Sequence, residues 1–108
     1  MSSVDFLVVL ITVPDAIVAE RLSNKLMETK AAACVNILSD VRSIFSWQGG
    51  LSTEDELLLI VKTRASFFEE RIVPLVEEHH PYEVPEIIAL PILKGSKSYL
   101  TWMEAEIG

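Results

Sequence analysis

The sequence predicts one α+β domain in which helices cover one face of an antiparallel sheet. Three observations predict this fold class: apolar, β-branched runs typical of strands, two segments with the four-residue spacing of amphipathic helices, and the order in which they alternate. No repeat or linker divides the 108 residues, so residues 1–108 are assigned to a single domain.

The first strand is predicted over residues 6–13, an apolar run rich in β-branched residues. Pro14 and Asp15 end this strand and open a helix that runs to about Thr29. Three large aliphatic residues recur at intervals of four in this helix: Val18, Leu22 and Leu26. One face of the helix is therefore expected to pack on the sheet.

A long second strand is predicted over residues 33–47, where apolar and polar residues alternate. The alternation fails near Ser39 and Asp40, so we expect a bend or bulge there. Residues 48–50 read Gln-Gly-Gly and predict a turn, after which residues 56–63 return as the third strand.

The second helix is predicted to begin at a capping box, in which Ser66 accepts a backbone N–H of the first turn and Glu69 reaches back. The helix ends at His79. Its apolar side carries Phe68, Ile72, Leu75 or Val76, and His79. Pro74 lies inside the helix and removes one backbone hydrogen bond, so a kink is expected near residues 70–74.

The fourth strand is predicted over residues 87–93, and Pro91 within it places its far end at a sheet edge. A short terminal helix follows Gly95. One side of that helix carries Tyr99, Trp102 and Met103. The complete order, strand-helix-strand-strand-helix-strand plus a final helix, is the ferredoxin-like βαββαβ split sheet with both main helices on one face.

Three of the predicted strands contain unbroken apolar runs, so both of their faces need to be buried. These runs are residues 7–11, 57–61 and 87–90. Two helices can cover only one face, and the short chain has little left with which to cover the other. Because so many exposed aliphatic side chains would be hard to keep in solution, we predict an obligate oligomer.

Charge and composition exclude several classes of partner. The chain has sixteen acidic and nine basic residues, a net charge of −7, and no basic stripe, so nucleic acid is not an expected partner. No apolar run reaches the length of a membrane span, and residues 6–13 lack the flanks of a signal peptide. Cys34 is the only cysteine, which excludes an intrachain disulfide. We expect a soluble, cytoplasmic protein.

The residues support little catalytic chemistry. There is no nucleophile elbow and no glycine-rich phosphate loop, and Cys34 falls in an apolar strand pattern that favours a core cysteine. The Lys62-Thr63-Arg64 stretch at a strand end suits either an anion or plain solvation. The chain is therefore not predicted to be an enzyme.

The segment from His79 to Glu86 is the most informative stretch of the chain. Pro81 and Pro85 keep the residues before them out of the helical conformation, which makes the segment stiff and extended. Such a segment holds polar side chains in fixed directions. It suits either a binding site, a subunit contact or a rigid connector with solvated side chains.

Metal binding is the chemistry that this segment favours, because neutral imidazole is a good ligand for copper and zinc. Four carboxylates surround the histidine pair: Glu77, Glu78, Glu83 and Glu86. Adjacent histidines project in different directions, so His79 and His80 need another segment or subunit to share one ion. In the alternative interpretation, His79 packs beside Leu75 and His80 hydrogen-bonds the turn.

Several motifs follow one another in an order that resembles a known family. They are Ala32-Ala33-Cys34-Val35-Asn36, Trp47 before a glycine turn, Lys62-Thr63, the His80–Glu86 segment, and the Tyr99-Leu100-x-Trp102 ending. From Phe6 to Trp102, the chain resembles the CutA family of divalent-ion tolerance proteins. The resemblance implies a ferredoxin-like subunit in a tight homotrimer, a response to metal ions, and binding of copper or another divalent cation.

Residue by residue, the resemblance implies two sites. His79 and His80 match the proposed copper ligands of bacterial members, whereas the cysteine of their first strand is Ile11 here, so metal binding is expected to be weak. A second set resembles the lining of an intersubunit cleft: Asn36, Trp47, Lys62, Tyr82 and Glu83.

Three functions are compatible with these residues. The first is a trimeric divalent-cation tolerance protein that binds copper. The second is a small-molecule sensor similar to the PII proteins, which would use the intersubunit cleft. The third is a structural trimer that scaffolds another protein. The sequence leaves the physiological metal, any cleft ligand and any protein partner open.

Overall fold

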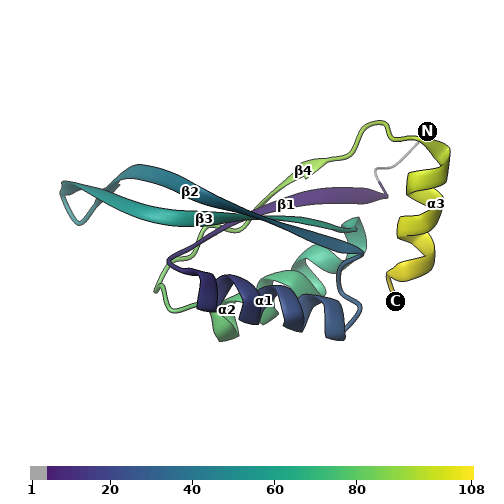
Figure 1. Cartoon of the computed structure of the whole chain (residues 1–108), viewed down its shortest axis with the longest axis horizontal. Coiled ribbons are helices and arrows are strands. Elements are labelled where there is room, and N and C mark those ends of the chain that lie inside the picture. The colour runs from purple at the N-terminus through teal and green to yellow at the C-terminus, as the bar shows by residue number, and fades with distance from the viewer. Residues whose placement is uncertain (1–4) are drawn as a thin grey trace.

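A computed structural model describes residues 5–108 of the chain, in which a four-stranded antiparallel sheet carries two helices on one face (Figure 1). The strand order is β2-β3-β1-β4. The elements are β1 (Phe6–Val13), α1 (Ala16–Glu28), β2 (Cys34–Trp47), β3 (Gly50–Arg64), η1 (Ala65–Phe67), η2 (Phe68–Ile72), α2 (Val73–His79), β4 (Ile88–Pro91) and α3 (Lys97–Glu106). The predicted ferredoxin-like order and the placement of both main helices on one face are confirmed.

Helix α1 begins and ends as its sequence predicts. Asp15 is the N-cap, and its Oδ1 accepts a hydrogen bond from the backbone N–H of Val18 at 2.9 Å. The predicted stripe is buried against the sheet, since Val18, Leu22 and Leu26 all lie in the core. The short capping side chain and the i+4 spacing therefore suffice to place this helix.

The β2–β3 hairpin contains the predicted bulge and turn but is longer than predicted. Its turn uses left-handed backbone at Gln48 and Gly49, with φ of 50° and 85°. Strand β3 begins at Gly50, so the predicted start at residue 56 was wrong. Residues 50–55 are mostly polar and give no apolar alternation; pairing with β2 makes them a strand. The hairpin extends beyond the two helices (Figure 1).

The bulge decides which residues of β2 face which side of the sheet. Leu38 lies opposite Leu58, but the next partners are Val41 and Glu56, so β2 gains one residue over β3. Asp40 adopts a φ of 64° at this point. Because opposite residues share a face, even-numbered residues before the bulge and odd-numbered residues after it lie on the same face.

The second helix differs from its prediction at the start. Ser66 does not cap it: the residue lies inside the 3₁₀ turn η1, where no side-chain cap hydrogen bond forms, so the predicted capping box was wrong. The N–H of Ala65 instead donates to the carbonyl of Asp5 at 2.8 Å. Residues 68–72, where the chain approaches the kink predicted near residues 70–74, form the π-helical turn η2, and Pro74 itself lies in the first turn of α2, where a proline is tolerated.

Strand β4 and helix α3 complete the chain. β4 has four residues, fewer than predicted, and it is an edge strand, as Pro91 predicts. Ser96 caps α3 through a hydrogen bond from the N–H of Tyr99. Of the apolar side chains predicted to share a side of this helix, Met103 is buried, whereas Tyr99 and Trp102 stay exposed with ring centroids 5.5 Å apart.

The two faces of the sheet are buried to different extents. On the helix-covered face, six residues of β1 and β3 are fully buried: Val9, Ile11, Val13, Leu59, Val61 and Thr63. On the opposite face, Leu10, Leu58 and Ile60 are only half-buried, and the β4 residues Ile88 and Leu90 are 52% and 53% exposed. A single chain therefore leaves one apolar face of the sheet uncovered, as the apolar runs predicted. No helix within residues 5–108 is long and apolar enough to span a membrane.

Candidate functional site

A cleft of about 680 Å³ lies on the uncovered sheet face, between the β2–β3 hairpin and the segment that follows His80. The register explains its composition, because the bulge in β2 brings Phe45 and Trp47 onto the face that carries Glu54 and Glu56. Its main walls are Phe45, Trp47, Glu54, Glu56, Tyr82, Glu83 and Glu86.

His80 anchors the segment that borders the cleft. Its imidazole is 7% exposed and lies against β1, with Nε2 2.8 Å from the carbonyl oxygen of Thr12. The backbone N–H of Tyr82 donates to Nδ1 at 3.1 Å. A carbonyl can only accept and an amide N–H can only donate, so the ring is the neutral tautomer with its proton on Nε2. Both nitrogens are therefore occupied, Nδ1 by the turn, as the connector interpretation expects for His80, and Nε2 by strand β1.

Tyr82 ties the same segment to β3. Its hydroxyl donates a hydrogen bond to Oε2 of Glu56 at 2.8 Å, and its ring stacks at a tilt on that of His80, with centroids 4.7 Å apart. Burial, and then the hydrogen bond and charge of Glu56, raise the pKa of Tyr82 above its usual range. The hydroxyl thus stays protonated and remains a donor to a carboxylate that is only 5% exposed.

The glutamates of the cleft influence one another. Partial burial in the cleft, followed by repulsion from Glu56, raises the pKa of Glu86. Glu54 and Asp15 add negative charge around Tyr82. No lysine, arginine or histidine from residues 5–108 lines the cleft. The cleft is therefore a region of negative potential with aromatic walls.

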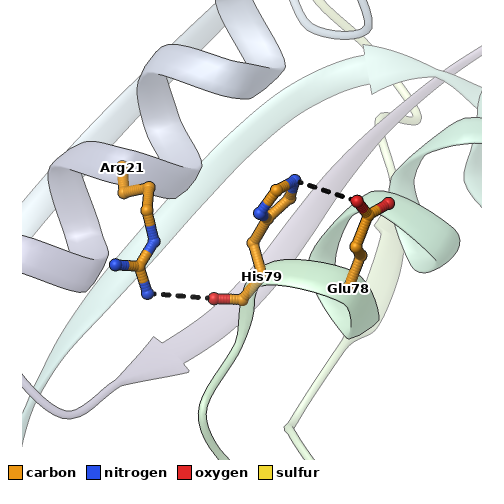
Figure 2. A network of polar contacts seen from close by, with 3 residues as sticks. All are labelled: Arg21, Glu78 and His79. Carbon is orange, nitrogen blue, oxygen red and sulfur yellow. Dashed lines mark hydrogen bonds and ion pairs between the residues drawn. The ribbon is translucent and has the colours of Figure 1, made fainter.

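His79 lies on the other side of the chain from this cleft, at the end of α2. Its Nε2 is 3.8 Å from Oε2 of Glu78, and its carbonyl accepts a hydrogen bond from the Arg21 guanidinium on α1 at 3.2 Å (Figure 2). The imidazole remains partly exposed. Within residues 5–108, no three side chains of His, Cys, Asp or Glu are grouped closely enough to hold a metal ion. A single chain thus offers His79 with one carboxylate and directs His80 elsewhere.

The five residues predicted to line an intersubunit cleft fall into two groups. Trp47, Tyr82 and Glu83 line the cleft described above. Asn36 and Lys62 instead lie further along the same sheet face, where the Lys62 ammonium donates to Oδ1 of Asn36. That these residues meet another subunit stays a prediction.

Four residues of the main cleft walls were not predicted to line it: Phe45, Glu54, Glu56 and Glu86. Glu54 fell outside the predicted third strand, and no face was assigned to the side chains of either strand. A signal was available in the sequence, since Ser52, Glu54 and Glu56 alternate along the strand in front of the apolar run. The extra residue at the bulge, however, fixes which half of β2 meets them.

The fold and the site define a small ferredoxin-like domain with an uncovered apolar sheet face and a cleft on that face. Residues 7–106 match the family described as CutA1 divalent ion tolerance protein. The chain belongs to this family, as its motifs predicted.

The chain is similar to known relatives and to a solved structure along nearly its whole length. The divalent-cation tolerance protein CutA of Thermus thermophilus is 46% identical over 101 residues, which cover 94% of this chain and 97% of that protein. The protein of the same description from Pectobacterium atrosepticum is 38% identical, covering 95% and 93%. The crystal structure of CutA1 from Oryza sativa superposes with a TM-score of 0.93 at 40% identity, covering 98% of this chain and 96% of that one. These relatives carry the description of tolerance proteins, not of enzymes.

Proposed function

We propose that the chain is the subunit of a homotrimeric divalent-cation tolerance protein of the cytoplasm, which binds copper and other divalent cations weakly. The relatives described as divalent-cation tolerance proteins support the metal class. The observation that carries the proposal is the pairing of two accessible ligand groups, the His79 imidazole and the Glu78 carboxylate, at 3.8 Å.

The geometry assigns different roles to the two adjacent histidines. Metal–nitrogen and metal–oxygen bonds are about 2.0–2.2 Å long, so one ion fits between Nε2 of His79 and the Glu78 carboxylate after a small side-chain rotation. His80 would first have to break its hydrogen bonds to Thr12 and Tyr82. His79 is therefore the principal ligand in this proposal, and His80 holds the segment in place.

Weak binding follows from the composition of this site. Two protein ligands leave further positions to water or to a neighbouring subunit, and the guanidinium of Arg21 bonded to the His79 carbonyl opposes an added cation. Ile11, which stands where bacterial members are expected to have a cysteine, is fully buried on the helix-covered face and offers no ligand atom.

Copper titration of the purified protein tests the assignment. We expect His79→Ala to weaken Cu²⁺ binding at least tenfold, because it removes the only unoccupied imidazole. His80→Ala should lower the melting temperature but change copper affinity less. Glu77→Ala, which alters an exposed carboxylate on the same helix, is the matched control. Unchanged copper affinity in the His79→Ala/His80→Ala double variant would contradict the metal proposal.

A second function, a small-molecule sensor that uses the cleft, is favoured by one observation: the cleft has the volume of an organic ligand site. Its carboxylate lining opposes nucleotides, whose phosphates carry negative charge. A sensor of this kind would therefore have to recognise a different class of ligand from the PII proteins.

A further inference from the structure

We propose that Arg21 acts as an internal competitor of the divalent cation at His79 and thereby sets how weakly that site binds metal. The inference rests on the proposed metal binding and names the residue that limits its affinity. Both residues belong to the helices, which cover the side of the sheet away from the face that other copies of the chain are expected to cover (Figure 1). Three observations support the inference.

The first observation is the place of the Arg21 guanidinium at the end of helix α2. Helical backbone runs through η2 and α2 and ends at His79, so the last carbonyls of this run carry partial negative charge that attracts cations. The guanidinium of Arg21, on α1, donates to the carbonyl oxygen of His79 at 3.2 Å (Figure 2). The helix end that would favour an added cation therefore already holds a positive charge.

The second observation is that no carboxylate neutralises this charge. Within residues 5–108, the ion pairs join Arg64 to Glu104 and Glu78 to His79, so no carboxylate lies within 4 Å of the Arg21 guanidinium. Arginine does not lose its proton in a protein. A metal ion on the imidazole of His79 would therefore be repelled by a permanent charge that is bonded to the backbone of the same residue.

The third observation is a second arginine that makes the same kind of contact at the other end of the helix pair. Arg71 of η2 donates to the carbonyl oxygen of Thr29, at the end of α1, and its guanidinium lies over the ring of Phe67, 4.4 Å from the centroid. The carboxyl end of each helical segment thus contacts an arginine of the other segment. Thr29 offers no imidazole or carboxylate, so Arg71 supplies a control for Arg21 within the same molecule.

The test is a calorimetric titration of the full-length protein with Cu²⁺ at about 0.1 M salt, where charges are screened over about 10 Å. Arg21→Gln removes the charge and keeps an amide donor, and we expect it to bind copper about three- to tenfold more tightly. Arg21→Lys keeps the charge and should bind copper as the unmodified protein does. Arg71→Gln removes the same charge about 12 Å further along the helices, at 1.5 Å per residue, and should leave copper affinity unchanged.

Three further measurements separate the effect of charge from a change in structure. At about 1 M salt the screening length falls to about 3 Å, so the gain in Arg21→Gln should largely disappear. The Arg21→Gln/His79→Ala variant should show no gain over His79→Ala, because the imidazole that binds the metal is absent. Without copper, Arg21→Gln and Arg71→Gln should both melt at lower temperature, since each loses a charged group at a helix end.

Two results would overturn the role of Arg21 without affecting the metal site. They are an unchanged copper affinity in Arg21→Gln, and an equal gain in Arg71→Gln, in a protein whose copper binding His79→Ala still weakens. If His79→Ala leaves copper binding unchanged, the metal site at His79 is wrong, and the proposed competition is wrong with it.

Discussion

The two faces of the sheet are built from the same strands, but their side chains are buried to different extents. Most side chains of β1 and β3 that point toward α1 and α2 are fully buried, whereas Leu10, Leu58 and Ile60 on the other face are only half-buried. The covered face therefore supplies the stability of the subunit. The uncovered face carries the cleft and the surface that we expect other copies of the chain to complete.

Substitutions at two adjacent residues of β1 should have the largest effects and test the difference between the two faces. Ile11 faces the helices and is fully buried, whereas Leu10 faces the other side. Ile11→Ala should lower the free energy of unfolding by about 2–5 kcal/mol, because it leaves a cavity in the core. Leu10→Ala should act mainly by weakening subunit association. Chemical denaturation, with sedimentation of the same samples, checks both, and equal losses of stability and of assembly in the two variants would contradict the difference between the faces.

The next effect concerns the hydrogen bond that joins Tyr82, in the segment of residues 80–86, to Glu56 of β3. Tyr82→Phe removes the hydroxyl that donates to buried Glu56, and a buried acceptor left without its donor costs about 1–3 kcal/mol. Tyr99→Phe makes the same chemical change on exposed α3 and should cost less than about 0.5 kcal/mol. Thermal unfolding of the two variants measures the difference. If they melt alike, the hydroxyl of Tyr82 does not hold the segment, and His80 and the prolines hold it instead.

The smallest expected effect depends on pH and on Glu86. Its pKa is raised in the folded chain, so the folded state binds this proton more tightly than the unfolded state, where the ordinary value of 4.5 applies. Its contribution therefore lowers stability as the pH rises from about 4.5 through the raised pKa. Glu86→Gln should be slightly more stable than the unmodified protein at pH 7, and the difference should vanish near pH 4.

Denaturation curves at pH 4 and pH 7 measure this contribution. Glu106→Gln, which removes an exposed carboxylate near the end of α3, is the control for the loss of one negative charge elsewhere on the chain. A Glu86→Gln variant that is less stable at pH 7 would mean that its carboxylate has a favourable partner, contrary to the crowding of negative charge in the cleft.

Periodicity predicted most of the fold because the core depends on it. The i+4 stripe of α1, the apolar runs of β1 and β3, and the edge position implied by Pro91 all follow from side chains that must be buried. The polar start of β3 could not be predicted in this way, because residues 50–55 lack apolar alternation and become a strand through hairpin pairing with residues 42–47. The capping box failed because of a long-range contact: the N–H of Ala65 bonds to Asp5, sixty residues earlier in the chain.

The candidate site could be predicted only in part. The stiff segment around Tyr82 was visible from Pro81 and Pro85, and so was the chemistry of the histidine pair. The separation of His79 from His80 depends on a backbone carbonyl of β1 that no local pattern reveals. Likewise, Glu56 joins the cleft because a bulged register sets its face, and the sequence locates the bulge without giving its effect on side-chain direction.

Sedimentation of the purified protein shows whether other copies of the chain cover the exposed sheet face. We predict a trimer at low micromolar concentration and no folded monomer on dilution, because Ile88 and Leu90 would then be left half-exposed beside Leu10 and Ile60. Ile60→Asp should abolish the trimer. A stable monomer that keeps its circular dichroism at nanomolar concentration would contradict the account.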